Sequence, residues 1–121
     1  MDSMDFDALE AAAKARMSPG AYAFVATGAD DEITAAENVA AWRALRLRPR
    51  VLRDITQIDT SATIQGVRVA MPIMVAPSGR HKAIHPEGER ATARGAAEAG
   101  AIYTLSTTSS VPIEEIAAVR G

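Results

Sequence analysis

Two short groups of small and polar residues follow two apolar segments, and they are the residues best placed to do chemistry. The stretch from Met71 to Glu89 (MPIMVAPSGRHKAIHPEGE) predicts a buried strand, a loop and the start of a helix, and a second strand ends at Leu105-Ser106-Thr107-Thr108. In parallel α/β folds, the carboxyl ends of the strands and the loops after them carry the chemistry. We therefore expect a ligand to lie against these two loops.

The same residues also have an ordinary structural interpretation. Pro77-Ser78-Gly79 is typical of a turn, and Ser106 is typical of a residue that caps a helix. On residue types alone, this interpretation is the favoured one. A ligand site at the strand ends therefore needs support from more than the local pattern.

Two histidines and an acidic cluster are the other candidates for a site. His81 and His85 lie four residues apart, but Gly79 and Pro86 place them in a loop without a third ligand, so we expect no zinc site. We expect His85 to cap the following helix or to support the loop. Residues 30–32 (DDE) predict N-terminal charge for a helix and not a metal site.

Arginines alternate with apolar residues in the segment LRLRPRVLRDI, which Pro49 predicts to be extended. Spaced arginines suggest an anion site, but on an extended segment they are more typical of a solvated edge with local acidic partners such as Asp54 and Asp59. The arginines concerned are Arg46, Arg48, Arg50 and Arg53.

The composition sets the outer limits on function. The chain has 121 residues, 48% of them hydrophobic, and a net charge of −2 from 13 basic and 15 acidic residues, which gives no electrostatic case for nucleic acid as a partner. It has no cysteine, which excludes disulfides and thiolate metal sites and is typical of a cytoplasmic protein. Neither a signal peptide nor a membrane-spanning segment is expected.

The first part of the chain predicts three helices. Residues 5–17 have helix-forming composition, Ser18-Pro19 should open a second helix (AYAFVAT) that Gly28 ends, and the capping-box spacing of Thr34 and Glu37 predicts a third helix from Ala35 to about Leu45. We expect Trp42 on this third helix to lie in the core. Residues 62–69 then resemble a small hairpin that turns at Gly66.

From Pro72 the pattern becomes a repeating unit of strand, loop and helix. The strand PIMVAP is almost continuously apolar, which predicts that both of its faces are buried. A helix then opens at residues 85–89 (HPEGE), with Pro86 at its start and Arg94 paired to Glu98, and ends at Gly100. A second strand covers residues 101–106, and a last helix covers residues 113–120 (IEEIAAVR).

At this point seven segments carry a resemblance. The chain resembles the N-terminal part of the FMN-dependent α-hydroxy-acid oxidases and dehydrogenases, the family of glycolate oxidase, lactate oxidase and mandelate dehydrogenase. One such segment is weak, whereas seven in order at family spacing are strong. They are residues 26–32 (ATGADDE), 36–38 (AEN), 48–54 (RPRVLRD), 71–77 (MPIMVAP), 85–89 (HPEGE), 91–94 (ATAR) and 105–107 (LST).

The resemblance implies an α/β fold that is the N-terminal portion of a (β/α)8 TIM barrel. Residues 1–70 would form the leading helices and the small hairpin, and residues 71–121 the first two barrel βα units. It implies FMN as cofactor, with Pro77, Ser78 and Gly79 along the flavin ring and Ser106 at its polar edge. A glycine lets the ring approach closely, and a hydroxyl both donates and accepts at such an edge.

Two residues correspond to the substrate pocket. Where many members have a tyrosine that contacts the substrate carboxylate, this chain has Phe24, which cannot donate a hydrogen bond. Tyr22 should not replace it, because positions two apart on a helix point to different sides. Thr108 lies near the pocket in the family, and its small size would admit a bulkier acid; an ordinary loop threonine is an equal alternative.

The resemblance implies oxidation of a small 2-hydroxy acid to a 2-oxo acid, as the N-terminal part of such an enzyme. The family's catalytic histidine and carboxylate-binding arginines belong to later strands, so no residue here is assigned as catalytic. A whole barrel needs about 250 residues, so we expect a truncated product or one piece of a split protein. Either a homo-oligomer or a complementing C-terminal chain would then complete it. The alternative is a non-catalytic fragment or interaction module whose strand edges pair with a partner.

Overall fold

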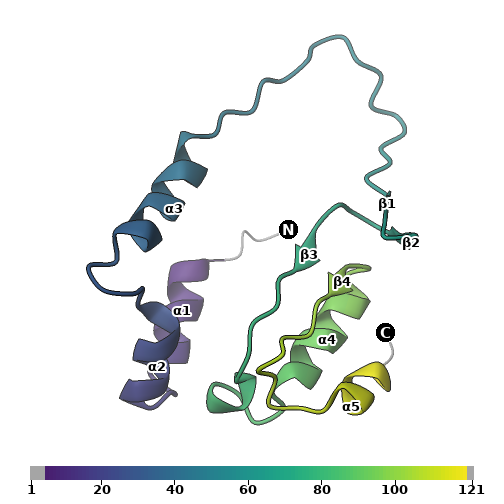
Figure 1. Ribbon diagram of the computed structural model, residues 1–121. Coiled ribbons are helices and arrows are strands. Elements are labelled where there is room, and N and C mark those ends of the chain that lie inside the picture. The colour runs from purple at the N-terminus through teal and green to yellow at the C-terminus, as the bar shows by residue number, and fades with distance from the viewer. Residues whose placement is uncertain (1–4, 120–121) are drawn as a thin grey trace. The chain divides into compact units, whose positions relative to one another are not determined.

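The computed structural model describes residues 5–119, which divide into two units, Met1–Arg53 and Asp54–Gly121 (Figure 1). Each unit is described by itself. Within residues 5–119, no helix is both long and apolar enough to cross a membrane.

The first unit consists of three helices, of which two begin as predicted. They are α1 (Phe6–Lys14), α2 (Pro19–Ala26) and α3 (Ile33–Ala44). The Asp5 carboxylate accepts the N–H of Ala8 at 3.0 Å, and the Ser18 hydroxyl accepts the N–H of Ala21 at 3.2 Å, with Pro19 at the first helical position. Side-chain caps of this kind satisfy N–H groups that have no partner inside the helix. The short polar residues before α1 and α2 therefore set where those helices begin.

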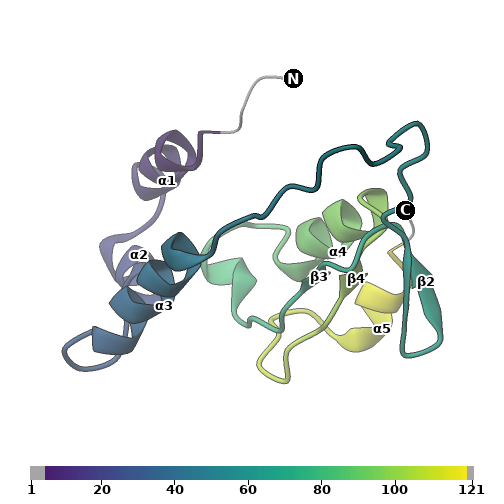
Figure 2. The same cartoon turned by 90° about the horizontal axis from the view of Figure 1, so that it is seen from above.

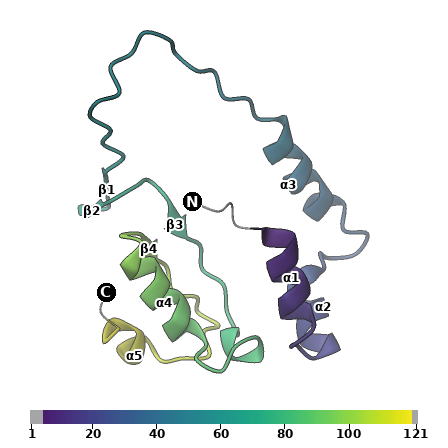
Figure 3. The ribbon, with the colours of Figure 1, turned by 180° about the vertical axis from the view of Figure 1, so that it is seen from behind.

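Contacts of one tyrosine join α1 to α2, which Figure 3 shows next to each other. The Tyr22 hydroxyl donates to the Glu10 carboxylate at 2.8 Å, and the Lys14 ammonium lies 4.8 Å from the centre of the Tyr22 ring. The hydrogen bond to Glu10 is the main cause that raises the pKa of Tyr22 above its ordinary value. The Tyr22 hydroxyl is thus engaged with α1, and the expectation that it does not take the place of a tyrosine at position 24 stays a prediction.

The predicted capping box before α3 is wrong. The N-cap residue is Glu32, in a left-handed conformation with φ of 58° and no side-chain cap, so Thr34 lies inside the helix. The Glu32 carboxylate instead accepts the N–H of Gly28 at 2.9 Å. The helix thus begins two residues earlier than predicted, because this turn uses the acidic side chain for a contact with the preceding segment.

The end of α2 also differs from the prediction. The helix stops at Ala26, and Thr27 follows in an extended conformation while its hydroxyl donates to the carbonyl of Ala23 at 2.7 Å. Gly28 also lacks the positive φ of a glycine that caps a helix, which Gly66, Gly88 and Gly100 of the described residues have. Gly28 therefore does not end the helix.

The prediction that Trp42 lies in the core is wrong. Its side chain is 76% exposed, and none of the described residues of α1, α2 or α3 is buried. Helix α3 has no packed face, so the large ring has nothing to pack against. The segment after it, residues 45–53, has no helix or strand, which agrees with the extended conformation predicted from Pro49.

The second unit begins with the predicted hairpin. Strands β1 (Ala62–Ile64) and β2 (Val67–Val69) pair antiparallel, and Ala62 lies opposite Val69. The turn residues Gln65 and Gly66 have φ of 51° and 80°. Two consecutive positive φ values are typical of the tight turns that join antiparallel strands.

A strand–helix–strand unit follows. Strand β3 (Met74–Val75) pairs parallel with β4 (Ile102–Tyr103), and helix α4 (Glu89–Glu98) runs between them and packs against β4. A short 3-10 helix, η1 (His81–Ala83), lies in the loop after β3, and α5 (Ile113–Ala117) contacts α4. Figure 2 shows β3 and β4 side by side with α4 next to them. The α/β fold is thus confirmed. Arg120, which was expected in the last helix, lies outside the described residues.

The core of this unit is small. The buried apolar residues of the described chain are Val69, Ala93, Ala96 and Val111, and two of them are the alanines that let α4 approach β4 closely. The prediction that the first strand is buried on both faces is wrong, because Ile73 and Met74 are 61% and 47% exposed. Two strands and one covering helix leave apolar surface open.

Two predicted charge pairs also differ. Arg94 forms its ion pair with Glu87 in the turn before α4 and not with Glu98. Pro86, which was predicted at the start of the helix, lies in the same turn outside it. The carboxylates proposed as partners of the arginine segment contact other groups. Asp54 accepts the N–H of Thr56, and Asp59 accepts the N–H of Ser61 and lies 3.9 Å from Arg68.

Ala70 makes one bond that joins the hairpin to the strand–helix–strand unit and one that closes the base of the hairpin itself. Its N–H donates to the carbonyl of Gly100 at 3.1 Å, and its carbonyl accepts the Thr60 hydroxyl at 2.8 Å. The hairpin thus belongs to the second unit, and the boundary between the two units lies after Arg53. The division into residues 1–70 and 71–121, which follows from the resemblance, stays a prediction.

Candidate functional site

The loops that follow β3 and β4 meet, as the sequence predicts for the carboxyl ends of two parallel strands. The N–H of Arg80 donates to the carbonyl of Thr108 at 3.2 Å. A Cβ atom at Gly79 would lie 2.0 Å from the Thr108 hydroxyl and 2.7 Å from its carbonyl oxygen. Only glycine fits such an approach. Of the predicted site residues, Gly79 and Thr108 are therefore in direct contact.

Ser106 belongs to the same contact. Its hydroxyl accepts the N–H of Thr108 at 3.2 Å and lies 3.1 Å from the Thr108 hydroxyl. Ser106 also lines a cavity of about 380 Å³ together with Leu105, Val111 and Ile113. Ser106 thus forms a local turn and does not cap a helix, because α5 begins only at Ile113 with Pro112 as its N-cap. The hydroxyl still keeps bonding capacity, since it has one proton and two lone pairs.

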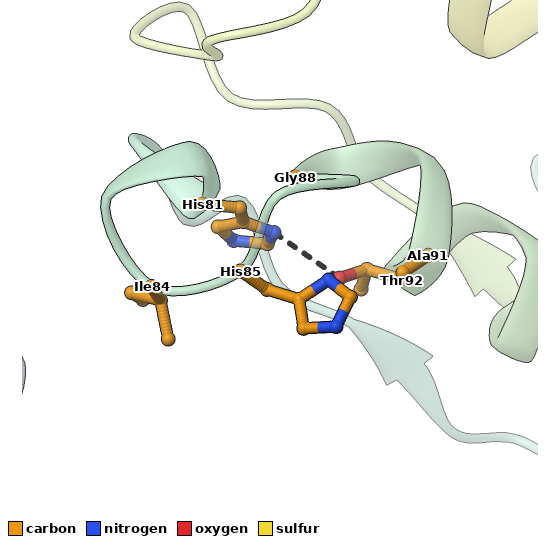
Figure 4. Close-up of a pocket in the computed structure, with 6 residues that line it drawn as sticks. All are labelled: His81, Ile84, His85, Gly88, Ala91 and Thr92. Atoms are coloured by element: carbon orange, nitrogen blue, oxygen red, sulfur yellow. Dashed lines mark hydrogen bonds between the residues drawn. The ribbon is translucent and has the colours of Figure 1, made fainter. Parts of the chain in front are cut away.

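The side chain of Ser78 is bonded to the ring of a histidine. Its hydroxyl lies 2.8 Å from Nε2 of His81, and Nδ1 of the same ring lies 3.1 Å from the hydroxyl of Thr92 on α4 (Figure 4). One ring thus connects the loop after β3 with the helix that follows it. Sequence reasoning considered His81 only as a metal ligand and missed this contact.

Glu89, the first residue of α4, holds both loops. It is the fully buried polar residue of the described chain. One carboxylate oxygen accepts the N–H of Ser110 at 2.8 Å and of His81 at 3.1 Å, and the other accepts the Ser110 hydroxyl at 2.6 Å. The Ser110 hydroxyl in turn accepts the N–H of Lys82 at 3.0 Å. Lys82 and Ser110 lie 28 positions apart in the chain, so the network joins the loop after β3 to the loop after β4.

The carboxyl group of Glu89 is ionised. Burial disfavours its charge, but the hydrogen bonds from the Ser110 hydroxyl and from the backbone of Ser110, Glu89 and His81 outweigh burial and lower the pKa to about 2. A buried carboxylate is stable only when its oxygens are bonded in this way. Sequence reasoning treated Glu89 as ordinary first-turn charge, because nothing in the spacing of HPEGE indicates burial.

A glycine lets the chain turn from this loop into α4. Gly88 has φ of 59° and ψ of −139°, a conformation that other residues rarely adopt. A Cβ atom there would also lie 2.8 Å from the Lys82 side chain. The turn delivers Glu89 into the interior between the two loops.

His85 has a different role from His81, although both line a cavity of about 400 Å³ with Ile84 and Thr92 (Figure 4). Its Nδ1 accepts the N–H of Glu87 at 3.3 Å, which agrees with the prediction that it supports the loop. Within residues 5–119, no group of three or more His, Asp or Glu residues is placed to hold a metal ion.

Two predicted residues remain, Pro77 and Phe24. Pro77 is exposed on the loop after β3, one residue before Ser78. Phe24 lies on α2 in the first unit, and its side chain is 60% exposed. Its role in a substrate pocket stays a prediction.

Comparison with known proteins identifies the family. Residues 13–121 match the FMN-dependent dehydrogenases. The chain belongs to this family. Its resemblance to the FMN-dependent hydroxy-acid oxidases, stated from seven sequence segments, is thereby confirmed.

Curated members of the family are 44% to 50% identical to this chain over the aligned residues. It is 50% identical over 105 residues to the peroxisomal (S)-2-hydroxy-acid oxidase of Oryza sativa subsp. indica, covering 87% of this chain and 29% of the rice protein. It is 44% identical over 117 residues to the glycolate oxidase of Spinacia oleracea, covering 97% of this chain and 32% of the spinach protein. The chain thus spans 29% to 32% of the length of these relatives.

Solved structures of family members have the same fold over this segment. A mandelate oxidase crystal structure superimposes with a TM-score of 0.91 at 41% identity, covering 98% of this chain and 34% of that protein. A mutant of mandelate oxidase that carries a C4a-OH-FMN adduct has a TM-score of 0.87 at 43% identity, covering 92% of this chain and 34% of that protein. The family and this adduct indicate FMN as the cofactor, as expected.

The loop after β3 fits a flavin. Within residues 5–119, the backbone N–H groups of Ser78 and Gly79 donate to no protein acceptor. A flavin ring has nitrogen and carbonyl acceptors along one edge, and Gly79 adds no side chain that would keep the ring away. The loop thus offers two adjacent N–H donors that have no protein acceptor within the described residues, and Glu89 anchors the loop through the N–H of His81. Such a pair of donors suits this cofactor.

Proposed function

We propose that this chain is the N-terminal part of a (β/α)8 barrel enzyme that uses FMN to oxidise a small 2-hydroxy acid to the 2-oxo acid. The observation that carries the proposal is the meeting of the two strand-end loops. Gly79 and Thr108 are in contact there, and the Ser78 and Gly79 N–H groups are without protein acceptors within the described residues. Ligands of barrel enzymes bind at this end of the strands.

Each site residue then has a role. Pro77, Ser78 and Gly79 lie along the flavin ring, mainly through backbone groups, and Ser106 bonds its polar edge. Thr108 and Phe24 wall the substrate pocket. Because Gly79 and Thr108 are in contact, a residue proposed for the cofactor and a residue proposed for the substrate lie next to each other.

When bound, FMN accepts a hydride equivalent from the α-carbon of the hydroxy acid. The residues described here bind and orient; none of them is assigned as the base that takes the hydroxyl proton. That base and the groups that hold the substrate carboxylate would come from further strands. Support for such strands is the exposed apolar surface of Met74 in β3 and of Ile73 just before it.

A homo-oligomer or a complementing C-terminal chain as partner stays a prediction from the sequence. A cytoplasmic location stays a prediction from the sequence. The rice relative is named as a peroxisomal enzyme.

A chimeric protein tests the proposal. Residues 1–121 replace the matched segment of spinach glycolate oxidase, and the spinach enzyme is the control. We expect one retained FMN per chain, bleached anaerobically by glycolate or by a larger 2-hydroxy acid. A folded chimera that stays colourless would contradict the cofactor site, and one that holds FMN but is bleached by no 2-hydroxy acid would contradict the substrate class.

The alternative is an interaction module that does no chemistry. The exposed Ile73 and Met74 at β3 favour the interaction module, because open strand edges can pair with another polypeptide. A folded, colourless chimera together with a stable complex between the chain and a separately produced spinach C-terminal segment would support this alternative.

A further inference from the structure

The His81 ring has a hydrogen-bond partner at each nitrogen. Nε2 lies 2.8 Å from the Ser78 hydroxyl and Nδ1 lies 3.1 Å from the Thr92 hydroxyl, which Figure 4 shows as the dashed contact to α4. The backbone of His81 is anchored as well, because its N–H donates to the buried Glu89 at 3.1 Å. The ring therefore has little freedom to turn away from either hydroxyl.

A neutral imidazole has one donor nitrogen and one acceptor nitrogen. If the proton is on Nδ1, the ring donates to Thr92, and Nε2 accepts the proton of the Ser78 hydroxyl. If the proton is on Nε2, the ring donates to Ser78, whose own proton is then available to another group. The position of one proton on His81 thus decides whether Ser78 can act toward another group only as an acceptor or also as a donor.

The neighbouring backbone favours the first arrangement. The N–H groups of Ser78 and Gly79 already supply two donors at this loop. A flavin edge carries N–H groups beside its acceptors, so a loop that offers only donors would leave an N–H of the ring opposite another proton. A lone pair from Ser78 supplies the missing acceptor.

We propose that His81 is a positioning residue that carries its proton on Nδ1 and thereby holds the Ser78 hydroxyl as a hydrogen-bond acceptor toward the cofactor. The inference rests on the proposed FMN site. His81 does not touch the cofactor and acts through Ser78. Because reduced FMN carries an N–H where oxidised FMN has a bare nitrogen, an acceptor at Ser78 favours the reduced form.

The chain contains an internal reference for the first test. His85 accepts the N–H of Glu87 at Nδ1, so its proton belongs on Nε2, opposite to the arrangement in His81. These are the two histidines of the sequence. Nitrogen-15 NMR of the imidazole rings, at a pH where both are neutral, should show a protonated Nδ1 in His81 and a protonated Nε2 in His85.

A variant of Ser78 assigns the nitrogen signals to the two histidines and tests the bond between Ser78 and His81. Ser78→Ala should move the Nε2 resonance of His81 and leave His85 unchanged. A proton on Nε2 of His81, or a His81 signal that ignores Ser78→Ala, overturns the proposal. This test needs no flavin, so it is independent of the proposed function.

The second test measures the FMN reduction potential in the spinach chimera. His81→Leu removes the acceptor for the Ser78 proton and should weaken the binding of reduced relative to oxidised FMN roughly fivefold, the effect of one hydrogen bond. His81→Gln keeps an acceptor and should restore most of the difference. Equal potentials in all three proteins, or equal changes in both variants, overturn the proposal. Loss of all FMN from the parent chimera would instead contradict the proposed function, and the NMR result would then decide the role of His81.

Discussion

The two units of this chain are built by different kinds of contact. In the first, the hydrogen bonds described above reach at most 12 positions, from Tyr22 to Glu10, and within the described residues of its helices no side chain is buried. In the second, a buried carboxylate at residue 89 bonds residues 81 and 110. Local contacts make helices, whereas a site at two loops needs contacts across many residues.

The largest effect is expected where the long-range network is removed. Glu89→Ala would leave the N–H groups of His81 and Ser110 without their acceptor and should destabilise the second unit by roughly 3 kcal/mol or more. The matched control is Glu98→Ala, an exposed glutamate at the other end of α4. Urea unfolding measures both; similar losses would show that the bonds of Glu89 do not hold the second unit together.

Acid should act on the second unit through the same carboxyl group. The pKa of Glu89 is about 2 in the folded chain and 4.5 as the ordinary value, so its stabilisation is fully present above pH 4.5 and is lost as the pH falls toward about 2. The amount is on the order of 3 kcal/mol. In Glu89→Gln the stability of this unit should depend much less on pH in that window. An unchanged profile, followed by urea unfolding at each pH, would contradict the charged state assigned to Glu89.

A methyl group at the contact of the two loops gives the next effect. Gly79→Ala would place Cβ 2.0 Å from the Thr108 hydroxyl and should cost roughly 1 to 3 kcal/mol. Gly95→Ala, inside α4 with no atom within 4 Å of the new Cβ, should instead stabilise by roughly 0.5 to 1 kcal/mol. Thermal unfolding should therefore move in opposite directions. If both variants gain stability, the loops are not in contact.

The first unit is expected to matter for substrate rather than for stability. In the spinach chimera, Phe24→Tyr adds a hydroxyl toward the substrate carboxylate, and a bond to a charged group contributes roughly 1.5 to 3 kcal/mol at best, or about tenfold and more in kcat/KM. Glycolate and lactate should gain, and mandelate should gain less or lose. If kcat/KM for all three acids changes by one factor, Phe24 does not face the carboxylate.

The smallest effect tests the absence of a core in the described part of the first unit. Trp42 is 76% exposed, so Trp42→Ala should change the stability of the 121-residue chain by less than about 0.5 kcal/mol. A buried tryptophan would cost roughly 3 to 5 kcal/mol. A loss of that size, measured by urea unfolding, would show that α3 packs and that the contrast between the units is wrong.

The sequence predicts what local residues decide. Ser18-Pro19 indicates the start of α2, and Gln65-Gly66 the turn of the hairpin, because caps and turns depend on a few neighbouring residues. The parallel pairing of β3 and β4 follows from two apolar segments separated by a helix. These features hold without knowledge of the rest of the chain.

Burial and the bonds inside the site could not be predicted in this way. In the sequence, Glu89 cannot be told from an ordinary acidic residue in the first turn of a helix, because its hydrogen-bond donors come from the loop around residue 110. Trp42 has the residue type of a core position, and only the structure shows that its helix has no packed face. The resemblance located Gly79, Ser106 and Thr108. It did not indicate that Gly79 touches Thr108, which is a property of the folded loops.

Hydrogen exchange in the spinach chimera tests the central claim most directly, namely that the loops after β3 and β4 form one surface for FMN. The amides of Ser78 and Gly79 have no protein acceptor within the described residues, whereas the amide of Ser110 already donates to Glu89. We predict that Ser78 and Gly79 exchange rapidly without FMN and become protected when it binds, while Ser110 is protected in both states. Rapid exchange at Ser78 and Gly79 in the FMN-bound chimera would contradict the site described here.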